Sequence, residues 1–86
     1  MPIICEFYGI KIMMFWNDHL PPHFHAQYGR HKILVDIRNG TVIKGVFPFK
    51  QLKLVLAWCE LHKDELLQNW ENGKNNLEFS KIDPLI

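Results

Sequence analysis

Residues 23–36 read HFHAQYGRHKILVD, and this stretch decides the fold. Apolar and polar residues alternate on both sides of Gly29, which is the pattern of two half-buried β-strands. Gly29 and Arg30 fit a two-residue type II′ turn, because that turn requires glycine in its first central position. The stretch therefore predicts an antiparallel β-hairpin with a defined register.

This register assigns one face of the hairpin to the core. Phe24 falls opposite Val35 and Ala26 falls opposite Ile33, with Tyr28 on the same face. A sheet face with these apolar side chains needs a second layer that covers it and excludes water. We expect the remainder of the chain to supply that layer and the other strands.

Two shorter apolar runs precede the hairpin. Residues 3–7 and 10–16 are rich in bulky apolar side chains and are separated by the turn signal Tyr8-Gly9. Both runs predict strands, and the second ends where asparagine, aspartate and two prolines force a loop over residues 17–22.

A further hairpin is marked by Asn39-Gly40. A three-residue loop with Gly40 in the left-handed conformation keeps Ile43 on the same side as Val35. The fifth strand is expected to end near Val46.

The C-terminal part has helical periodicity over residues 50–72, with Pro48 in the first turn and Gly73 as the C-terminal cap signal. Polar residues 62–64 indicate a local break between two helices. The wider apolar stripe, expected to cover the sheet, consists of Leu52, Val55, Leu56, Cys59, Leu66, Leu67 and Trp70.

A second helical stripe is formed by Leu54, Trp58 and Leu61. It has two interpretations, a docking face for a protein partner or packing inside a larger core. The sequence leaves both open.

Together these patterns predict an α+β fold, with a small antiparallel sheet of about five strands packed against one or two C-terminal helices. The 86 residues form one domain, with a sheet part over 1–47, a helical part over 48–73 and a tail over 74–86. The tail adds a short strand or packs as coil. A core this small gains from a homodimer or another partner.

Composition limits the function. Ten Lys and Arg against nine Asp and Glu give a net charge of +1, so no global basic field indicates nucleic-acid binding. Cys5 and Cys59 lie in apolar runs and are expected to be buried thiols. Without a signal-peptide pattern or a long apolar segment, we expect a cytoplasmic protein that does not enter membranes.

Candidate catalytic residues lie on and before the third strand. His23 falls opposite Asp36, with His25 two positions along on the same face, and the proline-stiffened loop adds Asp18 and His19. Two imidazoles beside a carboxylate can exchange protons with a substrate. The alternative is a surface sheet face with ordinary hydrogen-bonded histidines.

Basic and aromatic residues beside this cluster are the candidate substrate-binding group. Arg30 and Lys32 can steady a phosphate, and Tyr28 completes the set. The alternative for the basic residues is a solvated hairpin tip. The histidine spacing matches no strong zinc motif, so neither a metal nor another cofactor is expected. A metal-binding protein is nevertheless one alternative hypothesis.

The sequence resembles a bacterial family, the domain of unknown function numbered 4160. The resemblance is carried by FYGI (residues 7–10), NDH (17–19), PPHFHA (21–26), LVLAW (54–58) and DEL (64–66). Genes of that family often lie beside genes for the domain of unknown function numbered 2442, in pairs regarded as toxin–antitoxin modules. The resemblance therefore implies a toxin that is neutralised by a protein encoded nearby.

Two functional hypotheses follow. In the first, the protein is the toxin of a type II toxin–antitoxin module and acts on RNA through its His/Asp cluster, by acid–base cleavage without a metal. In the second, it is a non-catalytic binding module that docks a partner through the sheet edge and the helix face around Trp58.

Overall fold

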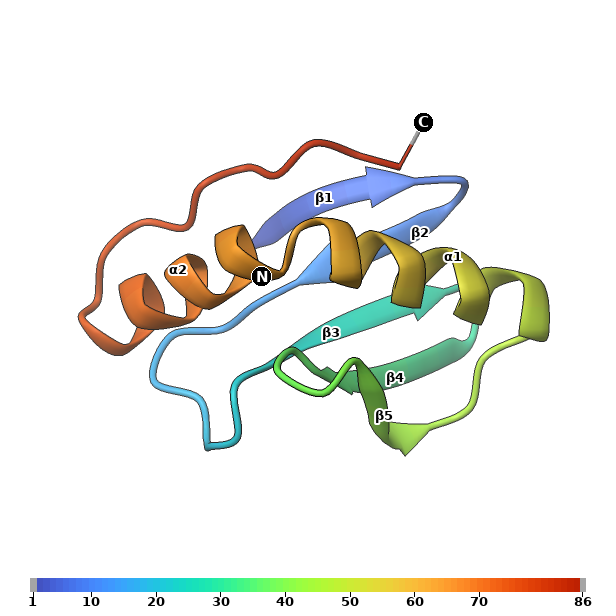
Figure 1. Ribbon diagram of the computed structural model, residues 1–86, viewed down its shortest axis with the longest axis horizontal. Helices are drawn as coiled ribbons and strands as arrows, with labels where there is room; N and C mark the ends of the chain where they lie inside the picture. Colours follow the sequence, from blue (N-terminus) through green and yellow to red (C-terminus); the bar gives the residue numbers. More distant parts are fainter. Residues whose placement is uncertain (1, 86) are drawn as a thin grey trace.

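The computed structural model describes residues 2–85. Five strands form one antiparallel sheet in the order β1-β2-β3-β4-β5, and two helices lie across one of its faces (Figure 1). The predicted α+β architecture is confirmed. The elements are β1 (Ile3–Phe7), β2 (Ile10–Met13), β3 (His23–Tyr28), β4 (His31–Asp36), β5 (Thr41–Gly45), α1 (Phe49–Leu61) and α2 (Lys63–Lys74).

The β3–β4 hairpin has the predicted register. Phe24 pairs with Val35, and His23 pairs with Asp36 at the Cα level. Gly29 has a φ of +57°, which the first central position of a type II′ turn requires. The alternation of side chains along β3 therefore places His23 and His25 on the opposite side of the strand from Phe24 and Ala26.

The β4–β5 pairing differs from the prediction. Val42, and not Ile43, lies opposite Val35, because the register shifts between Leu34 and Val35. Leu34 pairs with Lys44, so Ile43 is the additional residue of a β-bulge and is 46% exposed. The prediction that Ile43 shares the Val35 side was wrong, because Val42 lies opposite Val35 and packs against the core, and Ile43 is the residue that the bulge adds.

The core lies between the sheet and the helices. Trp58 is fully buried at its centre, and its indole N–H donates to the carbonyl of Asp83 at 2.8 Å. For Trp58, the structure therefore supports the interpretation of the second helical stripe as core packing. Leu54 is partly buried against the core, and Leu61 is 69% exposed. The buried residues of the wider helical stripe are Val55, Cys59, Leu66 and Trp70.

The break between the helices falls at His62, as predicted. Gly73 is not a cap, however, because α2 continues to Lys74 and the left-handed residue is Asn76. Gly73 instead permits close packing, since a Cβ there would lie 2.9 Å from Cε1 of Phe79. Within residues 2–85, no helix is long and apolar enough to cross a bilayer.

The tail packs as coil and runs beside β1 (Figure 1). The buried side chain of Asn69 on α2 binds the tail. Its amide donates to the Ser80 carbonyl and its oxygen accepts from the Ser80 N–H, both at 2.8 Å. Ile82 donates its N–H to the carbonyl of Ile4 in β1 at 3.0 Å. The tail therefore covers one edge of the sheet, and β5 forms the other edge.

Candidate functional site

The loop between β2 and β3 is tied to the C-terminal part of the chain. Asn17 donates its N–H to the carbonyl of Gly73 at 3.3 Å, and its side-chain amide donates to Asn76 Oδ1 at 3.0 Å. The indole N–H of Trp16 donates to the carbonyl of Leu77 at 2.9 Å. These contacts fix the backbone immediately before Asp18.

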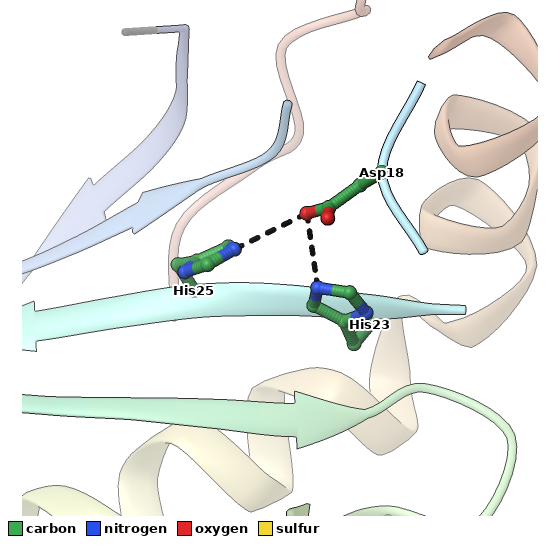
Figure 2. A group of neighbouring side chains, drawn as sticks. All are labelled: Asp18, His23 and His25. Atoms are coloured by element: carbon green, nitrogen blue, oxygen red, sulfur yellow. Dashed lines mark hydrogen bonds and ion pairs between the residues drawn. The ribbon is translucent and has the colours of Figure 1, made fainter. Parts of the chain in front are cut away.

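Asp18 lies over β3, where one of its oxygens meets two imidazoles (Figure 2). Oδ2 is 3.0 Å from Nε2 of His23 and 3.4 Å from Nε2 of His25. Oδ1 accepts the backbone N–H of His19 at 2.9 Å, which orients the carboxylate. A loop residue and two strand residues thus form one compact cluster.

His23 is 6% exposed, and both of its nitrogens face acceptors. Nδ1 is 2.8 Å from the carbonyl oxygen of Pro21, which can only accept, so Nδ1 must carry a hydrogen. Nε2 faces the Asp18 carboxylate. In the neutral ring with its hydrogen on Nδ1, the lone pair of Nε2 therefore points toward the carboxylate.

His25 is the more accessible imidazole, with a side chain 28% exposed. Its ring edge packs on Phe15 with 4.6 Å between ring centroids. Because Nε2 faces the carboxylate, the basic lone pair of a neutral His25 lies on Nδ1. The residue also lines a small open pocket of about 110 Å³, together with Met13, Phe15, Ala26, Gln27, Lys32 and Ile33.

The surroundings of Asp18 keep it ionised. Burial alone would raise the pKa of this carboxyl, but hydrogen bonds from the His19 N–H and from His25 lower it. The charges of His23 and His25 act in the same direction, and the pKa of Asp18 ends below its ordinary value. The cluster therefore presents a carboxylate to the imidazoles.

Asp36 does not join the cluster, although its Cα lies opposite that of His23. Its carboxylate accepts from the backbone N–H of Asn39 at 3.2 Å and from the Asn39 amide at 3.0 Å. These nearer turn donors hold the side chain of Asp36, so the structure does not bring this predicted site residue to the histidines. His19 contributes its backbone, while its side chain is exposed.

The predicted substrate-binding residues are separated. Lys32 lines the same pocket as His25, and Arg30 is exposed in the hairpin turn. Tyr28 lies on the core side of β3, and its ring meets Phe47 edge-on with 6.3 Å between centroids. Only Lys32 of these three is placed beside the cluster.

Two aromatic residues that wall the cluster were not predicted as site residues. Phe15 follows β2, and Trp70 on α2 packs on the His23 ring with 5.2 Å between centroids. The sequence indicates both only as apolar positions of a strand and a helix. Their spacing from the histidines along the chain contains no signal of contact.

The fold and the site define a class, a small α+β domain in which one loop aspartate and two histidines of β3 lie within mutual reach. The family Domain of unknown function (DUF4160) matches residues 9–71. The chain belongs to this family, which confirms the resemblance seen in the sequence. No curated protein and no solved structure matches this chain.

Proposed function

We propose that this protein is the toxin of a bacterial type II toxin–antitoxin module and that it cleaves RNA at the Asp18–His23–His25 cluster. The observation that carries the proposal is the shared oxygen Oδ2 of Asp18, which orients both imidazoles. A carboxylate that orients an imidazole and stabilises its protonated form is a recurring device of acid–base catalysis.

His25 is the proposed proton-transfer residue. Its Nδ1 takes the proton of a ribose 2′-hydroxyl, the 2′-oxygen attacks the phosphorus, and the resulting imidazolium protonates the leaving 5′-oxygen. Asp18 holds Nε2–H and stabilises the positive ring. His23 is a positioning residue, because it is buried and fixes Asp18 from the other side.

Lys32 is the proposed phosphate ligand. It shares the pocket of His25, and an ammonium group beside the reacting phosphate stabilises the charge that develops there. The 2′-hydroxyl attack leaves a 2′,3′-cyclic phosphate, so DNA and 2′-O-methyl RNA are not cleaved.

The test is cleavage of a labelled RNA by purified protein, with analysis of the product ends. We expect cyclic phosphate ends with the wild type and a loss of roughly 100-fold or more with His25→Ala. His62→Ala is the matched control, because His62 also pairs with a carboxylate, that of Glu65 at 2.6 Å, but lies outside the cluster. Equal cleavage by wild type and His25→Ala would contradict the proposal.

In bacteria, the same variants test the toxin. Expression of the wild type is expected to arrest growth, and expression of His23→Ala or His25→Ala is not. Growth that is unaffected by the wild type, or arrest that persists in both variants, refutes a toxic activity at this cluster.

The second candidate function is docking of a protein partner along β5. This strand is an uncovered edge of the sheet, and apolar side chains beside it are exposed: Ile43 by 46%, Val46 by 78% and Phe49 by 76%. An edge strand with apolar neighbours suits addition of a strand from another chain. The proposed partner is the antitoxin encoded nearby, the domain of unknown function numbered 2442.

Copurification with the neighbouring gene product tests this docking. Phe49→Glu is expected to weaken the complex at least tenfold, since a charge would be buried in an apolar interface. Leu61→Glu is the control, because Leu61 is 69% exposed at the other end of α1. Unchanged binding of Phe49→Glu would exclude this edge.

A further inference from the structure

The Asp18–His23–His25 cluster has the donor atoms of a metal site. One carboxylate oxygen and two imidazole nitrogens lie within 4.8 Å of one another, and they come from a loop and one face of a strand. We propose that these three side chains bind one divalent first-row transition-metal ion through Oδ2 of Asp18 and the Nε2 atoms of His23 and His25.

The distances suit such an ion. Metal–ligand bonds of about 2.1 Å at angles of roughly 90–110° place neighbouring ligand atoms about 3.0–3.4 Å apart. The structure has 3.0 Å from Oδ2 to Nε2 of His23 and 3.4 Å from Oδ2 to Nε2 of His25. The ligand atoms all lie within 4.8 Å of one another, and His25, whose side chain is 28% exposed, is the ligand that would move to complete the coordination.

The atoms behind the ligands are also those of a metal site. Metal-binding histidines usually donate their other N–H to a carbonyl or carboxylate, which leaves the ligating nitrogen unprotonated. Nδ1 of His23 faces the Pro21 carbonyl at 2.8 Å and meets this condition. The His19 N–H holds Oδ1 of Asp18 and turns Oδ2 toward the imidazoles.

This donor set selects the type of ion. Two imidazoles favour Zn²⁺, Ni²⁺ or Fe²⁺, whereas Mg²⁺ and Ca²⁺ prefer oxygen ligands. Asp18 is 22% exposed and His25 is 28% exposed, so water can occupy the remaining coordination positions. The proposal departs from the expectation of no metal, because the sequence spacing does not show how closely Asp18 approaches β3.

The metal also regulates the proposed cleavage, and this part of the inference rests on the proposed function. An imidazole that binds a metal through Nε2 carries its proton on Nδ1. His25 then has no lone pair to accept the 2′-hydroxyl proton. The metal-bound form is therefore the inactive form of the proposed ribonuclease.

Binding is tested with the metal alone. Protein stripped with a chelator is titrated with Zn²⁺ by calorimetry and with Co²⁺ by visible absorption, whose intensity reports the coordination. We expect one ion per chain. His25→Gln and Asp18→Asn should weaken binding by roughly 100-fold or more, beyond the 10–100-fold typical of a supporting residue. His62→Ala should bind as the wild type does, and circular dichroism checks the fold of each variant.

The outcomes separate the two proposals. Absence of one-to-one binding, or equal binding by the wild type and His25→Gln, overturns the metal site whatever the RNA assay shows. Metal binding without RNA cleavage supports the site and removes the proposed function. Where both occur, Zn²⁺ must inhibit cleavage and a chelator must restore it, and cleavage unaffected by saturating Zn²⁺ refutes the regulation.

Discussion

Replacement of Asp18 by asparagine separates the charge of the cluster from its shape. Asparagine keeps an oxygen for the His19 N–H and offers an N–H to Nε2 of His23, whose Nδ1–H stays on Pro21. In the variant, the hydrogen bonds to the His19 N–H and to His23 remain, but they no longer involve a charged group. The 3.4 Å contact with His25 is lost. Hydrogen bonds to charged groups are worth about 1 kcal/mol more than neutral ones. We therefore expect the free energy of unfolding to fall by about 2 kcal/mol near neutral pH.

The pH dependence has a definite sign. Burial alone would raise the pKa of Asp18, yet its hydrogen bonds and the nearby histidines leave that pKa below its ordinary value. A carboxyl with a depressed folded pKa stabilises the protein above its unfolded pKa of about 3.9, and the effect is lost as the pH falls through the folded pKa. The difference between wild type and Asp18→Asn is thus complete above about pH 5 and decreases from about pH 4 downward.

Urea unfolding followed by circular dichroism measures this difference, with a chelator present so that no ion occupies the cluster. In thermal unfolding at about pH 6, a loss of about 2 kcal/mol corresponds to a decrease in Tm of about 8–16 °C. Asp83→Asn is the control, because Asp83 is exposed and outside the cluster. Unchanged stability of Asp18→Asn, or a loss that persists undiminished near pH 3, would refute the proposed role of the carboxylate.

Three further predictions concern the fold around the site. Gly45→Ala should cost on the order of 2–4 kcal/mol in urea unfolding, since Gly45 has a φ of +91° and a Cβ would lie 2.1 Å from the Lys32 carbonyl oxygen. Asn69→Ala should release the tail, because both bonds to Ser80 are lost, and limited proteolysis would cut the tail first. Burial, with Glu60 nearby, raises the pKa of Cys59 to about 11, so a thiol reagent should modify Cys59 near pH 8 only after unfolding.

The β3–β4 hairpin could be predicted from sequence because its determinants are local. Alternation marks the two faces, and Gly29 sets the turn, so the pairing of His23 with Asp36 follows within a few residues. The next hairpin shows where this reasoning stops. A bulge at Ile43 changes the facing residues without any change in the apolar pattern.

The carboxylate partner of His23 shows a second limit. Strand register predicts which Cα atoms are opposite, and it favoured Asp36, while Asp18 was a candidate only through its place in the preceding loop. Side chains are nevertheless held by their nearest donors, and Asn39 supplies two of them to Asp36. Asp18 meets the imidazoles because its loop folds back over β3 (Figure 2). The prolines of the loop predict a turn, but they do not predict its direction.

The loop that carries Asp18 is positioned by contacts far away in the chain. Asn17 is bonded to Asn76 and to the carbonyl of Gly73, and Trp16 is bonded to the carbonyl of Leu77. The tail that includes Leu77 is in turn held by the buried Asn69. The cluster therefore depends on packing of the C-terminal part of the chain, whereas the β3–β4 hairpin depends on its own turn. Loss of the tail contacts should accordingly weaken binding at Asp18 before it disrupts the sheet, and metal titration of the Asn69→Ala protein measures the two separately.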